Sequence, residues 1–211
     1  MKRPKYEAVL FDFDGTIVDV NTFINAYTKN FISRHDLKIE TSPEFFYALN
    51  MDVAEISYDL KKEFWDGYMA QEINTIVLFD NLTDLLVAMK NAGIKLGIVS
   101  GRKRAKIVQI LTRLNVLTFF SAIIGPEEVS KIKPDPEPLL RCMTDLNAQP
   151  ENTLYIGNNK DDIEAGNAAK VDTIFFIDNE TYYSRVKVWL EKNKTTKVIQ
   201  NYLQLHTILG V

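Results

Sequence analysis

The feature that most constrains the fold of this chain is a repeated alternation of short apolar runs with amphipathic segments. After residue 81, segments whose apolar residues recur at helical spacing lead into short runs rich in β-branched residues. Such alternation favours a parallel sheet, because each helix carries the chain back to the same edge of the sheet. We therefore predict an α/β fold: a Rossmann-like parallel sheet with helices on both faces. The predicted strands are Ala8–Phe11, Ile94–Val99, Ala122–Ile124, Thr153–Ile156 and Thr173–Ile177, and the tail after them is predicted to be helical with an interruption near Lys197–Ile199.

The segment from residue 20 to residue 79 departs from this alternation. It is rich in aromatic residues, and Phe23, Tyr27 and Phe31 recur at helical spacing. We therefore predict that residues 20–79 form an inserted α-helical cap domain, and that residues 1–19 and 80–211 form the α/β core domain. The cap aromatics expected to pack together are Phe45, Phe46, Tyr47, Phe64, Trp65 and Tyr68.

Charge and composition exclude several classes of partner. The formal net charge of -3 offers no electrostatic attraction for a nucleic-acid backbone. The chain contains no apolar stretch approaching the roughly 20 residues that cross a bilayer. With 46% hydrophobic residues and no secretory signal pattern after Met1, we expect a cytoplasmic protein, monomeric or homodimeric. Its single cysteine, Cys142, has apolar neighbours and is expected to be a packed thiol.

The first strand ends in two acids separated by one residue. Asp12 and Asp14 follow the apolar run, and the period of a strand places them on the same side of the backbone. Gly15 then lets the chain turn at once. Two carboxylates so placed suit a hard cation, so this strand end is a candidate metal-dependent site.

Polar residues follow other predicted strands as well. Ser100 and Gly101 come after the second strand, and the fourth is followed by Gly157–Asp162. Lys133 precedes a proline, which favours an extended backbone ahead of the next helix. In parallel sheets ligands bind at the carboxyl ends of the strands, so we expect these groups to converge there. Acids, a hydroxyl and an ammonium together suit phosphoryl transfer.

These motifs resemble those of the haloacid dehalogenase superfamily of hydrolases, in the helical-cap branch that includes phosphoglycolate phosphatase and beta-phosphoglucomutase. The resemblance covers nearly the whole chain. It rests on four motifs in order: Asp12–Thr16 after an apolar strand, Ser100 after Ile98 and Val99, Lys133–Pro136, and Gly157–Asp162 followed by Ala165–Ala169.

The resemblance implies a role for each matching residue. Asp12 would be the nucleophile that forms an aspartyl-phosphate, and Asp14 the general acid and base, with Thr16 orienting it at the phosphate site. Ser100 and Gly101 would bind a phosphoryl oxygen, while Lys133 would neutralise phosphate and nucleophile. The implied cofactor is Mg²⁺, and its implied ligands are Asp12, Asp14 through its carbonyl, Asn158 and Asp162.

Asn158 departs from the family pattern, which commonly has aspartate directly after the glycine. A neutral amide oxygen holds a hard cation less well than a carboxylate, so weaker metal binding is expected. Asp161, next to Asp162, is a hypothetical compensating ligand. The same asparagine leaves open a binding module that holds phosphorylated ligands without turnover.

Arg102 has two interpretations. It begins a basic turn, Arg102–Arg104, that is either solvated or uses Arg102 to contact the phosphate or an anionic leaving group. The function expected overall is hydrolysis of a small phosphorylated metabolite. A phosphomutase and a pyrophosphatase of the same superfamily remain alternatives, and a dehalogenase fits these acids less well.

Overall fold

The computed structural model describes residues 5–39, 56–177, 180–192 and 197–211. The chain forms two compact units. One comprises Met1–Val18 and Leu78–Val211, and the other comprises Asp19–Val77. The chain passes between the units at strands β2 (Val18–Asp19) and β3 (Val77–Leu78), which pair as a separate two-stranded sheet.

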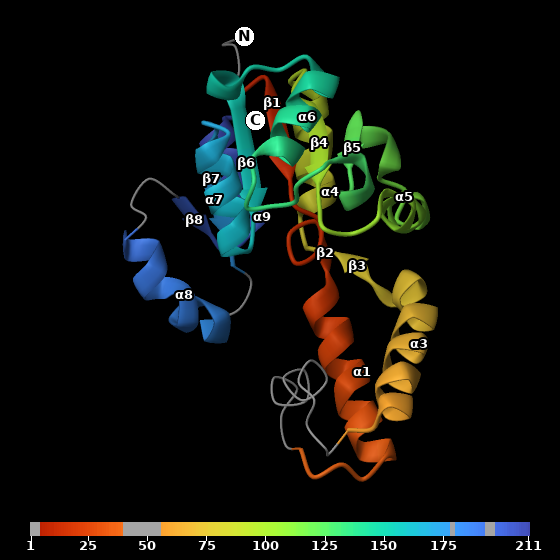
Figure 1. The fold of residues 1–211 in the computed structure, drawn as a ribbon. Coiled ribbons are helices and arrows are strands. Elements are labelled where there is room, and N and C mark those ends of the chain that lie inside the picture. Colours follow the sequence, from red (N-terminus) through yellow and green to blue (C-terminus); the bar gives the residue numbers. More distant parts are fainter. Residues whose placement is uncertain (1–4, 40–55, 178–179, 193–196) are drawn as a thin grey trace. The chain divides into compact units, whose positions relative to one another are not determined.

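The first unit is built on a six-stranded sheet in the order β5-β4-β1-β6-β7-β8, and every neighbouring pair of strands is parallel. The chain runs from β1 outward to β4 and β5, then returns to the other side of β1 at β6 (Figure 1). This confirms the predicted parallel α/β sheet and places the reversal of strand order beside β1. The strands are β1 (Ala8–Phe11), β4 (Lys95–Val99), β5 (Ala122–Ile124), β6 (Thr153–Gly157), β7 (Asp172–Phe176) and β8 (Lys197–Ile199).

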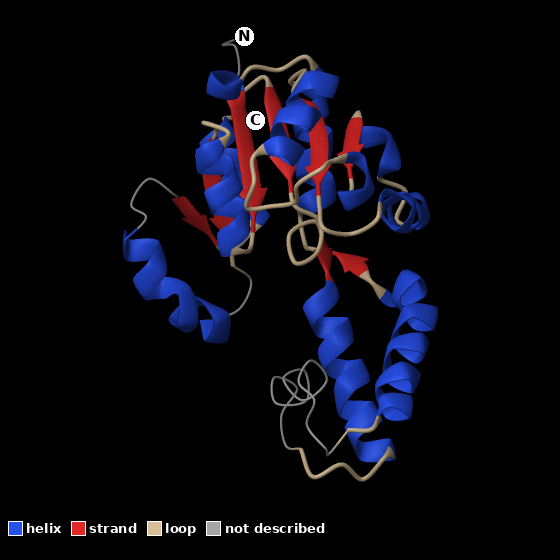
Figure 2. Ribbon diagram, viewed as in Figure 1, coloured by secondary structure: helices blue, strands red, loops and turns tan. Residues whose placement is uncertain are grey.

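Helices cover both faces of this sheet (Figure 2). Helices α6 and α7 contact the strands on one face, whereas α4 and α9 contact each other on the opposite face. Helix α4 ends where the sequence places a glycine: Gly93 follows its last turn with a φ of 76°, which a residue without a Cβ adopts at little cost. The α-helices of this unit are α4 (Leu82–Asn91), α5 (Arg104–Arg113), α6 (Glu137–Leu146), α7 (Lys160–Ala168), α8 (Glu180–Lys192) and α9 (Tyr202–Leu209), with 3-10 turns at Leu117–Phe119, Pro126–Glu128 and Pro150–Asn152.

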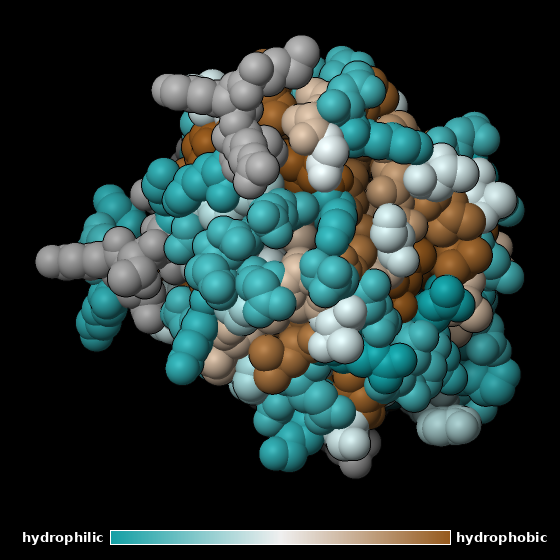
Figure 3. Space-filling view, turned by 90° about the horizontal axis from the view of Figure 1, so that it is seen from above, coloured by the Kyte–Doolittle hydropathy of each residue, from teal (hydrophilic) through white to brown (hydrophobic). Residues whose placement is uncertain are grey.

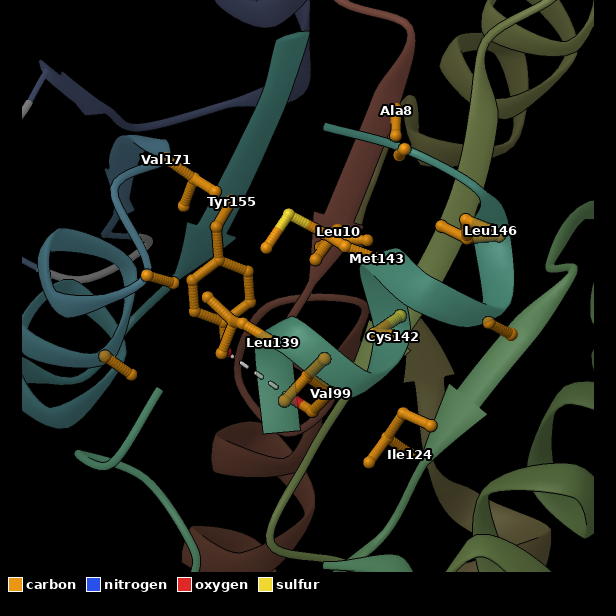
Figure 4. Packing of buried hydrophobic residues seen from close by; sticks show 14 residues of the cluster. Ala8, Leu10, Val99, Ile124, Leu139, Cys142, Met143, Leu146, Tyr155 and Val171 are labelled. Carbon is orange, nitrogen blue, oxygen red and sulfur yellow. Dashed lines mark hydrogen bonds between the residues drawn. The ribbon is translucent and has the colours of Figure 1, made fainter. Parts of the chain in front are cut away.

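The central strand β1 is buried on both faces, as its unbroken apolar run requires. Alternate residues face opposite layers, and Ala8 and Leu10 pack beneath α6 (Figure 4). Cys142 lies within the same cluster and is fully buried. This confirms the prediction of a packed thiol, and burial raises its pKa.

The interruption expected in the helical tail is a sixth strand. Lys197–Ile199 pairs with β7, with Ile174 opposite Lys197 and Phe176 opposite Ile199. The equally short strand β5 is wholly apolar and buried, whereas this segment begins with a lysine and has two exposed residues, so the sequence marked a break without revealing that it joins the sheet. The following helix α9 brings Tyr202 into the core, where its ring stacks on Phe176 with centroids 4.8 Å apart.

The second unit contains two helices among its described residues, α1 (Val20–Arg34) and α3 (Tyr58–Thr75). Aromatic rings join them: Phe31 meets Phe64 edge-on at 5.1 Å, and Phe23 stacks on Tyr68 at 5.2 Å. Phe64 and Tyr68 are buried and Trp65 is half-buried. Phe45, Phe46 and Tyr47 lie outside the described residues.

None of the helices in the described ranges combines the length and apolar character that a membrane span requires. The face drawn in Figure 3 carries hydrophilic side chains over much of its area, with hydrophobic ones in smaller groups.

Candidate active site

A cavity of about 530 Å³ lies at the carboxyl ends of the central strands of the first unit. It sits where the strand order reverses, which is where open α/β sheets bind ligands. Its lining includes the apolar residues Val99, Val129 and Ile132. The predicted site residues among its lining are Asp12, Asp14, Ser100, Gly101, Arg102, Lys133 and Asp162.

Lys133 connects the end of β1 to the start of α7, the helix that follows β6. Its Nζ donates to Oδ1 of Asp12 at 2.7 Å and to Oδ1 of Asp162 at 2.6 Å. Only 13% of the Lys133 side chain is exposed, against 7% for Asp12 and 1% for Asp162. The ammonium therefore lies between two buried carboxylates whose charges would otherwise repel each other.

Asp162 has both carboxylate oxygens occupied by donors of the chain. Its Oδ1 accepts from Lys133 and from the Tyr155 hydroxyl at 2.8 Å, while Oδ2 accepts the backbone N–H groups of Asn158 and Asn159. The local cause is a capping box, in which the third residue of α7 reaches back to the start of its own helix. Asp162, predicted as a metal ligand, is thus placed as the anchor of Lys133 and of the loop after β6.

Tyr155 belongs to this network, although the sequence did not single it out. Its ring is fully buried, and its hydroxyl also receives a hydrogen bond from Lys133 at 3.1 Å. The same hydroxyl contacts the carbonyl of Val99 at 3.4 Å, drawn as a dashed line in Figure 4. A tyrosine between Leu154 and Ile156, two positions before Gly157, was the available signal. A buried polar group needs partners, and here they are the site residues.

The network changes the protonation of its members. Burial raises the pKa of Asp12 to about 7, although Lys133 beside it acts in the opposite direction. Burial alone would lower the pKa of Lys133, but the charges of Asp12 and Asp162 outweigh it and raise that pKa above its usual value. Lys133 is therefore a permanent cation, and Asp12 is a carboxylate that titrates near neutral pH.

Asp14 is held by Arg102. The Nε of Arg102 lies 3.1 Å and 2.9 Å from Oδ1 and Oδ2 of Asp14, and its Nη2 lies 2.8 Å from Oδ1. The side chain of Arg102 is 15% exposed, so the solvated interpretation of this residue is wrong. Arg104, two residues later, is exposed as a solvated basic turn requires.

Ser100 lies at the end of β4, buried to 7% exposure and lining the cavity. Its hydroxyl oxygen accepts the backbone N–H of Arg102 at 3.1 Å, and the turn continues through Gly101 into the lining. Because a hydroxyl that accepts through its oxygen keeps its own proton for another partner, Ser100 can donate to an anion in the cavity.

Thr16 and Asn158 do not line the cavity. Thr16 is fully buried, its hydroxyl has no hydrogen-bond partner among the described residues, and its carbonyl accepts from the Tyr202 hydroxyl. Asn158 packs its amide against Gly15, where a Cβ would lie 2.1 Å from the amide nitrogen. Its amide oxygen accepts from the side chain of Asn159 at 3.2 Å. The Thr16 side chain therefore lies in the interior, and the Asn158 amide lies beside the turn at Gly15.

The oxygen donors in the cavity lining fit a hard cation. They include the carboxylates of Asp12 and Asp161. No group of three acidic, histidine or cysteine side chains placed to hold a metal occurs in the described ranges. Mg²⁺ in phosphoryl-transfer sites is commonly held by one or two carboxylates together with substrate oxygens. The donor set therefore matches that cation through Asp12 and Asp161.

Comparison with known proteins finds a matching family and relatives of at least 30% identity. The sequence pattern of the haloacid dehalogenase-like hydrolase family matches residues 9–176 of the chain. Pyrophosphatase PpaX of Oceanobacillus iheyensis is 34% identical over 175 residues, which make up 78% of this chain and 80% of that protein. An N-acetylmuramic acid 6-phosphate phosphatase of Pseudomonas aeruginosa is 30% identical over 187 residues, or 82% of each chain.

The fold also matches solved structures. A HAD-superfamily hydrolase from Ehrlichia chaffeensis superimposes with a TM-score of 0.65 at 22% identity, covering 99% of this chain and 97% of that one. At this identity the match supports the arrangement of strands and helices described above.

Proposed function

This chain belongs to the haloacid dehalogenase-like hydrolase family, and on that premise we propose that it is a Mg²⁺-dependent phosphatase acting on a small phosphorylated metabolite through an aspartyl-phosphate. The observation that carries the proposal is the placement of Lys133 between Asp12 and Asp162 beside the hydroxyl of Ser100. These groups line a cavity of about 530 Å³, a volume typical of small-molecule sites.

In the first step an oxygen of Asp12 attacks the phosphorus, and the bond from phosphorus to the leaving oxygen breaks. Lys133 holds Asp12 in place and offsets negative charge on the transferred group. Ser100 donates its hydroxyl proton in a hydrogen bond to a phosphoryl oxygen. Asp14 delivers a proton to the leaving oxygen, so that an alcohol departs.

In the second step water attacks the phosphorus of the aspartyl-phosphate and gives a proton to Asp14. The bond from phosphorus to the Asp12 oxygen breaks, which restores the carboxylate and releases inorganic phosphate. Mg²⁺, when bound through Asp12 and Asp161, supplies further stabilisation of charge on the phosphoryl oxygens.

We assign the unit Asp19–Val77 to the role of a cap that selects the leaving group. The chain enters this unit directly after the Asp12–Thr16 turn, so the insertion begins beside the catalytic residues in sequence. None of the proposed catalytic residues belongs to it, which leaves the choice of substrate to the insertion and to the cavity wall.

The proposal is tested by assaying phosphate release from a panel of phosphorylated compounds with and without Mg²⁺. The panel includes phosphoglycolate, sugar phosphates, N-acetylmuramic acid 6-phosphate and inorganic pyrophosphate, chosen from the activities named for relatives. We expect Mg²⁺-dependent release from at least one compound. Asp12→Asn should lower it by at least about 1,000-fold, because it removes the nucleophile. Equal release by wild type and Asp12→Asn would refute the assignment.

The same panel separates the alternatives. A pyrophosphatase releases two phosphates from pyrophosphate, an outcome favoured by the similarity to pyrophosphatase PpaX. A phosphomutase requires a bisphosphate activator and returns an isomer of its substrate. A binding module binds members of the panel but shows no turnover that depends on Asp12.

Metal dependence gives a second prediction. Asp161→Asn should raise the Mg²⁺ concentration for half-maximal activity by about 10-fold, because the cation loses one of its two carboxylates. Asn158→Asp should lower that concentration, since it adds a carboxylate next to Asn159, which lines the cavity. Glu164→Gln removes an exposed acid of the same helix outside the cavity and serves as the control. Unchanged Mg²⁺ dependence in both site variants would contradict this assignment.

A further inference from the structure

We infer that Arg102 recognises a second anionic group on the leaving side of the substrate, and that in binding it Arg102 releases Asp14 for proton transfer. The inference rests on the proposed function and narrows its substrate class to phosphoryl compounds that carry another carboxylate or phosphate. It begins from the bidentate contact of Arg102 with Asp14, whose three distances lie between 2.8 and 3.1 Å.

This contact occupies the group proposed to move protons. Nε of Arg102 faces both carboxylate oxygens of Asp14, and Nη2 adds a second donor at Oδ1. A guanidinium donates hydrogen bonds and accepts none, and its three contacts fill three of the roughly four acceptor positions of the Asp14 carboxylate. Release of part of the guanidinium therefore opens Asp14 to a leaving oxygen or to water.

Arg102 is the cation of the site best placed to change partners. Lys133 is enclosed by Asp12 and Asp162 and is needed by both. Arg102 lines the cavity, and the Asp14 that it holds is 33% exposed, so an incoming ligand can approach the pair. Its backbone N–H stays on Ser100, and its guanidinium carbon lies 6.0 Å from the centre of the Phe13 ring. In the proposed exchange the side chain changes partner while the backbone N–H stays on Ser100.

Replacing Asp14 by a substrate anion keeps the guanidinium of Arg102 paired with a negative group. Carboxylate and phosphate groups present paired oxygens that fit the fork of a guanidinium as Asp14 does. A substrate anion can therefore replace Asp14 without leaving a partly buried positive charge unpaired. A substrate without a second anion offers no replacement, so Asp14 stays held and proton transfer is slow. Selectivity for substrates with two anions then appears in turnover as well as in binding.

The test compares phenyl phosphate, which has no second anion, with phosphoglycolate and inorganic pyrophosphate. For Arg102→Ala we expect kcat/KM of the two-anion compounds to fall about 10-fold to 100-fold, mainly through KM. The kcat for phenyl phosphate should rise about 2-fold to 10-fold, because Asp14 is no longer held. Arg102→Lys keeps the charge but loses the fork and should give intermediate values. If kcat/KM falls for only one of phosphoglycolate and pyrophosphate, that compound carries the anion that Arg102 recognises.

Arg104→Ala is the matched control. It removes an exposed arginine of the same turn, outside the cavity, and should leave all three substrates unchanged. An equal fall for every substrate in Arg102→Ala would overturn the inference, because Arg102 would then only position Asp14. No change for any substrate would overturn it as well.

A binding measurement separates this inference from the proposed function, because it needs no turnover. In the Asp12→Asn background, calorimetry should show that Arg102→Ala weakens the binding of pyrophosphate or phosphoglycolate by about 10-fold or more. The same substitution should weaken the binding of inorganic phosphate by about 3-fold at most. If wild type hydrolyses nothing while this difference holds, the proposed function fails and the recognition role stands. Equal weakening of all three anions would refute the recognition role alone.

Discussion

Lys133→Met is expected to lower the free energy of unfolding by about 3–5 kcal/mol and to abolish turnover. The substitution leaves Asp12 and Asp162 side by side in the interior with no cation between them. Each carboxylate is at least nine-tenths buried, so water cannot take the place of the ammonium. Methionine fills a similar volume, which confines the change to charge and hydrogen bonds. Urea denaturation at neutral pH measures the loss.

Two further variants make this result specific. Lys131→Met removes an exposed lysine, 72% of whose side chain is accessible, from an ion pair with Asp135, and should cost less than about 1 kcal/mol. The double variant Lys133→Met/Asp162→Asn removes one of the two stranded charges and should recover part of the lost stability, but none of the activity. If Lys133→Met and Lys131→Met unfold at the same urea concentration, Lys133 does not hold the strand ends together.

The fold followed from the sequence because the relevant signals are local and repeated. Apolar runs such as Ala8–Phe11 and helical spacing around Leu85 and Leu86 fix the type of each element. The rule that crossovers are right-handed then fixes the two-sided arrangement. Strand β8 was not predicted because it lacks an apolar run, with two of its three residues exposed, and its place in the sheet depends on pairing with β7.

The site was predictable in outline, since strand ends in a parallel sheet must converge. Asp12, Ser100 and Lys133 line one cavity as the motifs indicated. The partners of each group were not predictable, because hydrogen bonds between distant segments depend on angles that a sequence pattern does not contain. The Asp14–Arg102 pair and the Lys133–Asp162 pair are of this kind. The contact of the Asn158 amide with Gly15 is another detail that the motif did not contain.

The burial of Asp12 predicts a pH-dependent stability. Burial raises the pKa of this carboxyl from 3.8 to about 7 in the folded chain. Between these two pKa values the folded state therefore binds more protons than the unfolded state. The stabilising contribution of protonated Asp12 is complete below the unfolded pKa of 3.8 and is lost as pH rises through the folded pKa of about 7. The wild-type free energy of unfolding should fall over this window by up to about 4 kcal/mol, at 1.36 kcal/mol per pH unit.

Asp12→Asn removes the titrating group and so should remove this decline. In buffer with a chelator, the stability of the variant relative to wild type should increase by about 2–3 kcal/mol between about pH 5 and about pH 8. Added Mg²⁺ should reduce the difference, because a cation beside Asp12 favours the ionised form. Asp161→Asn, which removes an exposed acid of the same cavity, should run parallel to wild type over the same range. Parallel curves for wild type and Asp12→Asn would mean that Asp12 is ionised throughout, with Lys133 outweighing the cost of its burial.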